Sequence, residues 1–269
     1  MNKANDIFDK LWTIYTEQNP QAKHIHELFV ERGENVINDH IAFRTFDDSR
    51  IDIEVLAKPF IESGYEHKGD YHFPEKKLYA KHYEHKTDKN APRVFISQLI
   101  TKEFSAFLQE TISDTISKTS EQDLISDKLI YSGKIWGEVS YEIYNKLREE
   151  SEYAAWLYVN GFRANHFTVS VNNLKTFDGI REVNQFLKDN GLLMNDSGGE
   201  VKGTKEQLLE QSSIKAGMEL TNFKEGQFEV PACYYEFAMR YPDKKGNLYS
   251  GFIANSADKI FESTDFYKK

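Results

Sequence analysis

The sequence is poor in cysteine, has no long apolar run and carries no excess of positive charge. Its single cysteine, Cys233, excludes an intramolecular disulfide and fits a reducing compartment. No apolar stretch approaches the ~18 residues of a membrane span. The opening residues, MNKANDIFDK, lack the apolar segment of a signal peptide. We therefore expect a cytoplasmic protein with no membrane partner.

The charge balance argues against nucleic acid as a partner. There are 43 acidic and 34 basic side chains, which give a formal net charge of −9. A protein that binds nucleic acid needs a basic footprint instead. An acidic protein that binds a small anion must supply positive charge locally, from an arginine or a metal ion. We expect a small anionic ligand, and the sequence does not define the oligomeric state.

The pattern of one strand, one helix and three strands occurs twice. In residues 35–100 the strands are expected at 38–46, 65–72, 78–85 and 93–99, with a helix at 51–63. In residues 164–241 they are expected at 164–171, 192–195, 207–214 and 232–241, with a helix at 177–190. The sequence thus predicts an α+β fold of two βαβββ modules in one domain.

Three further segments surround the two modules. Two amphipathic helices are expected in residues 1–34, at 4–17 and 20–32. Residues 101–163 have the apolar spacing of a mostly helical insertion, and residues 242–269 form a C-terminal tail.

The strand at 38–46, NDHIAFRTF, carries charged groups on a face that also holds apolar residues. Because side chains alternate along a strand, the two expected faces are His40, Ala42, Arg44 and Phe46, and Asp39, Ile41, Phe43 and Thr45. An imidazole that can hold a metal, with a guanidinium one small molecule away, suggests a site for an anionic ligand. The alternative is a core histidine with a local partner and an arginine in a salt bridge.

The second module supplies two more candidates for the same site. His166 lies on its first strand, and Glu236 lies in the middle of the apolar last strand, where an unpaired carboxylate would be costly. If the modules share a cavity, His40, His166 and Glu236 converge as two imidazoles and one carboxylate. That set is typical of non-haem Fe(II) oxygenases, although it can equally hold a catalytic Zn²⁺. A salt bridge is the alternative for Glu236.

Several motifs resemble those of a known family. The runs NDHIAFRTF, EYAAWLYVNGFRANHFTVSV, EQLLEQSS, YYEFA and SADKIFEST are similar to the DUF1338 family, from about residue 35 to 266. Its characterised members are 2-oxoadipate dioxygenase/decarboxylases, also called D-2-hydroxyglutarate synthases. The resemblance implies a fold like that of the vicinal oxygen chelate superfamily. It also implies metal ligands at His40, His166 and Glu236 and a substrate-binding arginine at Arg44.

The function expected from these observations is oxidation of a 2-oxo acid. An Fe(II) enzyme would convert a 2-oxo acid such as 2-oxoadipate, with O₂, to a shortened 2-hydroxy acid and CO₂. Gln98 and Gln211, on strands that should border the cavity, are further candidates for substrate binding. Zn²⁺ or Ni²⁺ can take the place of iron in purified protein. Two alternatives stay open: a metal-dependent lyase, isomerase or hydrolase, and a non-catalytic ligand-binding module.

Overall fold

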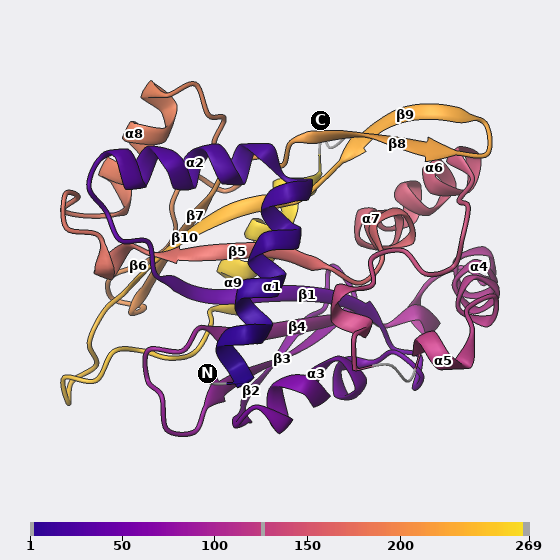
Figure 1. Ribbon diagram of the computed structural model, residues 1–269, viewed down its shortest axis with the longest axis horizontal. Coiled ribbons are helices and arrows are strands. Elements are labelled where there is room, and N and C mark those ends of the chain that lie inside the picture. The colour runs from indigo at the N-terminus through magenta and orange to yellow at the C-terminus, as the bar shows by residue number, and fades with distance from the viewer. Residues whose placement is uncertain (1–2, 125–126, 266–269) are drawn as a thin grey trace.

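An eight-stranded mixed β-sheet lies at the centre of the protein, and the computed structural model describes residues 3–124 and 127–265 (Figure 1). The strand order is β2-β3-β4-β1-β5-β10-β7-β6. Its first four strands are β1 (Asn38–Phe46), β2 (Tyr65–Phe73), β3 (Leu78–His85) and β4 (Arg93–Leu99). The others are β5 (Ala164–Ser170), β6 (Lys202–Thr204), β7 (Leu209–Ser213) and β10 (Tyr234–Arg240).

The first half of the sheet follows the predicted order of one strand, one helix and three strands. After β1 the chain forms α3 (Ile53–Glu62), whose N-cap Asp52 accepts a hydrogen bond from the Val55 amide. Strands β2, β3 and β4 are antiparallel neighbours, and β4 returns to pair in parallel with β1. The predicted limits of β3 and β4 are confirmed, and those of β2 and α3 are correct to within two residues.

The second half repeats this order with two departures from the prediction. It consists of β5, α8 (Ile180–Asp189), β6, β7 and β10, and β10 pairs in parallel with β5. The prediction of a strand at 192–195 was wrong, because only Met194 there makes an isolated bridge, to Ile214. The strand that pairs with β7 is β6, which begins after the glycine turn at 198–199. A hairpin of β8 (Met218–Phe223) and β9 (Gly226–Pro231), not predicted, is inserted before β10.

The two halves join through β1 and β5. These strands are antiparallel, with Ala42 opposite His166 and His40 opposite Thr168. Each half therefore contributes its first strand to the middle of the sheet. The predicted α+β fold of two βαβββ modules is confirmed, and the two histidine strands are direct neighbours.

Two N-terminal helices pack on the sheet. Helix α1 (Lys3–Gln18) crosses in front of it in Figure 1, and α2 (Pro20–Glu31) follows with its proline in the first turn. The rings of Trp12 and Tyr15 lie 5.0 and 4.8 Å from the ring of Phe167 in β5. The Tyr15 hydroxyl donates to the carbonyl of Tyr234. These contacts hold β5 and β10 from the face opposite the one that carries His166.

The predicted helical insertion lies at one end of the sheet (Figure 1). Its helices are α4 (Ala106–Ser117), α5 (Glu121–Leu124), α6 (Tyr141–Glu150) and α7 (Glu152–Asn160). Residues 153–160 of α7 are all buried, and Gly161 ends the helix with φ of 64°. A Cβ atom on Gly161 would lie 2.2 Å from the Gly133 carbonyl oxygen, so only glycine fits this turn into β5.

The C-terminal segment fills the concave side of the sheet. Helix α9 (Ala254–Ile260) and the 3₁₀ turn Phe261–Thr264 lie behind the sheet in Figure 1. Helix α9 contacts β2 at one edge of the sheet and β6 at the other. The sheet is therefore curled around this segment, which the sequence had indicated only as a tail.

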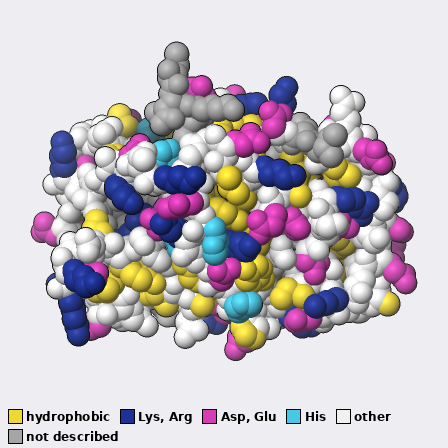
Figure 2. Space-filling view, turned by 90° about the horizontal axis from the view of Figure 1, so that it is seen from below, with side chains coloured by type: hydrophobic (Ala, Val, Ile, Leu, Met, Phe, Trp, Pro, Cys, Tyr) yellow, Lys and Arg dark blue, Asp and Glu magenta, His cyan; other side chains and the backbone are white. Residues whose placement is uncertain are grey.

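The surface carries charges of both signs, as the composition predicts (Figure 2). Figure 2 shows one face of the molecule, on which acidic and basic side chains are interspersed with hydrophobic ones. None of the helices within the described residues has both the length and the apolar character needed to cross a membrane.

Candidate metal centre

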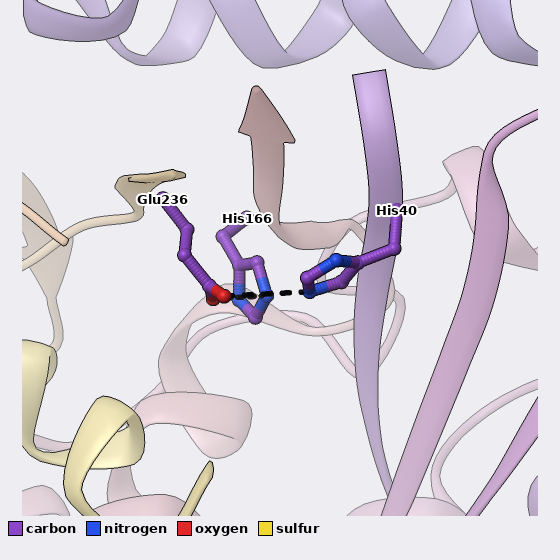
Figure 3. Close-up of side chains that lie close together, drawn as sticks. All are labelled: His40, His166 and Glu236. Atoms are coloured by element: carbon purple, nitrogen blue, oxygen red, sulfur yellow. Dashed lines mark ion pairs between the residues drawn. The ribbon is translucent and has the colours of Figure 1, made fainter. Parts of the chain in front are cut away.

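Three buried side chains from three adjacent strands converge on the concave side of the sheet (Figure 3). They are His40 of β1, His166 of β5 and Glu236 of β10. The Nε2 atom of His166 lies 3.1 Å from Glu236 Oε2, and that of His40 lies 3.6 Å from Glu236 Oε1. One atom from each residue falls within 4.8 Å of the others. The structure thus brings together the three ligands that the sequence predicted.

Both imidazoles are oriented by the residue that precedes them. His40 Nδ1 lies 2.8 Å from Asp39 Oδ1, and His166 Nδ1 lies 3.1 Å from Asn165 Oδ1. A proton on Nδ1 that is donated to these oxygens leaves the Nε2 lone pair directed into the site. His166 Nε2 is buried and, apart from its 3.1 Å contact with the Glu236 carboxylate, has no hydrogen-bond partner within the described residues. This donor set fits a divalent metal ion.

Strict alternation predicted that Asp39 and His40 lie on opposite faces of the strand, but in the structure their side chains are in contact. The register of the β1–β5 pairing shifts between Asn38 and His40, and this bulge disrupts the alternation. The Asp39 carboxylate accepts hydrogen bonds from Arg240 Nε at 2.7 Å and Nη2 at 2.9 Å. Burial acts to raise the pKa of Asp39, but the Arg240 guanidinium and His40 hold it well below its usual value. Asp39 is therefore a charged carboxylate that supports His40.

The protonation states suit metal binding. Burial acts to raise the pKa of Glu236, but the neighbouring His40 and His166 bring it below its usual value. Burial also lowers the pKa of His166, although Glu236 opposes this shift. The site therefore favours a carboxylate and a neutral imidazole, the forms that bind a metal ion.

Gln211 of β7 supports Glu236 and borders the site. Its Nε2 donates to Glu236 Oε1 at 2.7 Å, while its Oε1 is buried without a hydrogen-bond partner in the described part of the chain. The structure therefore places this predicted residue at the metal centre, where one of its polar atoms is still available to a ligand.

A small cavity adjoins the three residues, and the C-terminal segment closes it. Its volume is about 20 Å³, which is room for roughly one water molecule. It is lined by the triad and by Phe95, Gln211, Tyr234, Phe252, Ala257, Ile260 and Phe261. Four of these residues come from the C-terminal segment, which sequence periodicity did not connect with the site. The motif SADKIFEST, which resembles the family, contains three of them, Ala257, Ile260 and Phe261, and is the signal that could have found those three.

Arg44 lies near the cavity but does not line it. Its side chain is 1% exposed, and its Nη2 donates to Thr264 Oγ1 at 3.1 Å. The guanidinium carbon lies 4.9 Å from the ring centres of both Tyr153 and Trp156. Its Nη1 lies 3.5 Å from Glu152 Oε1, so the salt bridge that we considered as an alternative does form.

Gln98 is not brought to the cavity. Its Oε1 accepts a hydrogen bond at 3.2 Å from the backbone amide of Ile53, at the start of α3. Helix α3 packs on β4 and on β2, and Gln98 is absent from the residues that border the cavity. Its role in substrate binding stays a prediction, which this position does not favour.

Comparison with known proteins identifies the family. A family model described as 2-oxoadipate dioxygenase/decarboxylase matches residues 4–247. The chain belongs to the 2-oxoadipate dioxygenase/decarboxylase family. A rice protein, the chloroplastic/amyloplastic 2-oxoadipate dioxygenase/decarboxylase, is 35% identical over 96% of this chain and 78% of its own length. The recognition of the family from sequence motifs is therefore confirmed.

Several solved structures have the same fold. Rice hydroxyglutarate synthase in complex with 2-oxoadipate superposes with a TM-score of 0.88 at 33% identity, over 98% of this chain and 93% of that one. A protein of Shewanella frigidimarina, provisionally named a hydrolase, has a TM-score of 0.89 at 48% identity, with coverage of 94% and 99%. A Ralstonia eutropha protein, provisionally placed in the glyoxalase superfamily, has a TM-score of 0.78 at 18% identity, with coverage of 94% and 86%. The last match, at this low identity, concerns the fold alone.

Proposed function

We propose that this protein is an Fe(II)-dependent 2-oxoadipate dioxygenase/decarboxylase. It would convert 2-oxoadipate and O₂ to 2-hydroxyglutarate and CO₂, a reaction in which all atoms of both reactants appear in the two products. The observation that carries the proposal is the buried set of two imidazoles and one carboxylate in a chain of this family. The rice structure, which is named as a complex with 2-oxoadipate, supports a small 2-oxo acid as substrate.

The three strands would hold the metal ion through His40, His166 and Glu236. Two imidazoles and one carboxylate leave positions open on one side of an ion. A ferrous ion bound there supplies redox chemistry toward O₂ and a position for the 2-oxo acid. The chain itself would keep each imidazole neutral with its Nε2 lone pair free for the metal, since Asp39 and Asn165 accept hydrogen bonds from the Nδ1–H groups.

Arg44 would bind the distal carboxylate of the substrate. A guanidinium presents a planar fork that pairs with a carboxylate through two hydrogen bonds. Its Nε and Nη1 atoms are buried without hydrogen-bond partners in the described residues, so their N–H groups can donate to a substrate carboxylate. Gln211, with its unpaired Oε1 beside Glu236, would orient the part of the substrate nearest the metal.

The test is oxygen uptake by protein loaded with Fe(II) in the absence of air. With 2-oxoadipate as substrate we expect uptake of O₂ together with release of CO₂. Isotopically labelled O₂ should place one labelled oxygen in the new hydroxyl and one in a carboxylate of the product. Product without label, or turnover without oxygen, would contradict a dioxygenase.

A metal-dependent hydrolase is the second candidate, because the Shewanella relative, at 48% identity, carries that provisional name. The same triad can hold a catalytic Zn²⁺ with an open position. The test is to assay Zn²⁺-loaded protein in the absence of O₂, since catalytic activity under these conditions would favour the hydrolase.

A cytoplasmic location also stays a proposal, supported by the single buried cysteine.

A further inference from the structure

Arg44 forms an ion pair with an acidic residue, Glu152, that is neither a candidate metal ligand nor part of the wall of the metal cavity. Glu152 is the first residue of α7, and its Oε1 lies 3.5 Å from Arg44 Nη1. Its side chain is only 19% exposed, and Oε1 is buried without a hydrogen-bond partner in the described residues. Arg44 is thus neutralised by an ion pair that leaves hydrogen-bonding atoms unused on both partners.

Glu152 also faces a much larger space than the metal cavity. A hollow of about 640 Å³ is bordered by Glu152, by three basic side chains (Lys76, Lys77 and Arg148) and by five other acidic ones (Glu75, Glu149, Glu150, Glu262 and Asp265). Phe261 borders both this hollow and the metal cavity. The pair of Arg44 and Glu152 therefore lies between a hollow lined by charges of both signs and the closed metal centre.

We propose that Glu152 competes with the distal carboxylate of the substrate for Arg44, and that it turns toward the hollow when a dicarboxylate binds. This inference rests on the proposed function, in which Arg44 binds that carboxylate. Glu152 would act by occupying the guanidinium when no substrate is present. It would set the selectivity between 2-oxo acids with and without a distal carboxylate.

The charges explain why the exchange is required. A buried guanidinium without a counter-charge is strongly destabilised, so Arg44 needs a carboxylate whether or not substrate is bound. Two carboxylates at one guanidinium would repel each other, because like charges in a site of low dielectric interact strongly. The two carboxylates therefore weaken each other's hold on Arg44, and Glu152 is the one that yields because the substrate is fixed at its other end by the metal centre.

The hollow gives the Glu152 carboxylate a position away from Arg44. As the first residue of α7 it lies at the helix N-terminus, where the peptide dipoles stabilise a negative charge. Lys76, which also borders the hollow, acts on the Glu152 carboxylate as a favourable charge. Burial and the neighbouring Asp265 carboxylate raise the pKa of Glu152, while Arg44, a hydrogen bond with Thr264 and Lys76 oppose this rise. The charged form of the carboxylate is therefore disfavoured at its buried position, and movement toward solvent would stabilise it.

Glu152→Gln distinguishes competition from a structural role. If Glu152 competes, the variant should bind 2-oxoadipate more tightly by about tenfold, equivalent to ~1.4 kcal/mol. Binding of 2-oxohexanoate, which has the same chain but no distal carboxylate, should change by less than about twofold, a shift below ~0.5 kcal/mol. If Glu152 instead only holds Arg44 in position, the variant should bind 2-oxoadipate more weakly.

The measurement is calorimetric titration of metal-loaded protein without O₂, so that binding is observed without turnover. Glu149→Gln is the matched control, because Glu149 is exposed and borders the same hollow; it should leave both affinities unchanged. Glu152→Asp, which retracts the charge by one methylene, should tighten 2-oxoadipate binding in the same direction but less. This second variant decides the question if Glu152→Gln does not fold.

The outcomes separate this inference from the proposed function. Unchanged or weaker 2-oxoadipate binding by the Glu152 variants, while the wild-type protein consumes O₂ with 2-oxoadipate, overturns the competition and leaves the enzyme activity intact. Tighter binding by the variants, without O₂ consumption by any of the proteins, supports the competition and rejects the dioxygenase.

Discussion

Replacing Asp39 with asparagine should weaken both the fold and the metal centre. The Asp39 carboxylate accepts two hydrogen bonds from Arg240, at 2.7 and 2.9 Å, and lies 2.8 Å from His40 Nδ1. Asparagine has nearly the same shape but no charge, and its amide group would face the donors of the guanidinium. Arg240 is 2% exposed and would keep the carbonyls of Tyr249 and Gly251 and one asparagine oxygen as acceptors, but it would lose its ion pair with Asp39.

The magnitude follows from leaving a buried cation without its partner. Breaking a buried ion pair on one side costs about 3–5 kcal/mol, a large part of the ~5–15 kcal/mol that keeps a typical domain folded. Loss of the carboxylate behind His40 should in addition lower metal affinity by about 10–100-fold. The first effect is measured by urea unfolding of metal-free protein, and the second by titration with Co²⁺ or Zn²⁺.

Asp48→Asn is the control for this experiment. Asp48 pairs with Arg50 at 2.7 Å, but the two side chains are 26% and 40% exposed. Such a surface pair contributes about 0–1 kcal/mol, and Asp48 does not line the metal cavity. If the Asp39 variant unfolds at the same urea concentration as the Asp48 variant and binds metal normally, our account of Asp39 is incorrect.

Three further predictions concern the metal and the substrate. His166→Ala should lower metal content sharply, because two remaining protein ligands make a poor site; full metal content by elemental analysis would exclude the triad. Arg44→Lys should raise the KM for 2-oxoadipate while metal content stays unchanged, since a lysine cannot form the two-pronged contact with a carboxylate; normal turnover would make Arg44 structural. Removing the metal with a chelator should leave the far-ultraviolet circular dichroism nearly unchanged, because the core is extensive and aromatic; loss of the spectrum would show that folding depends on the metal.

Much of the site could be predicted from local sequence alone. The alternation of side chains along β5 and β10 correctly placed His166 and Glu236 on faces that can converge, and an acidic residue in an apolar strand is costly unless it has a partner. The recurrence of a histidine on the first strand of each module then indicated where the modules meet. Long motifs added the family, because they covered most of the chain.

The features that sequence reasoning missed depend on contacts between distant segments. The bulge that turns Asp39 toward His40 arises where β1 pairs with β5, and no local pattern reveals it. Strands were predicted at 192–195 and 207–214, but pairing with β7 selected Lys202–Thr204 in place of 192–195. Hydrophobic periodicity cannot make that choice, because both segments are short.

The sequence by itself determined most of the central strands, the three candidate metal ligands and the family, since these follow from local alternation and from contiguous motifs. The tertiary structure alone decided that the C-terminal segment closes the cavity and that Glu152 meets Arg44. An open sheet face must be covered by some apolar segment, but the segment that covers it is selected by packing across the whole chain. A pairing such as that of Arg44 and Glu152 exists only once β1 and α7 have been brought together in space.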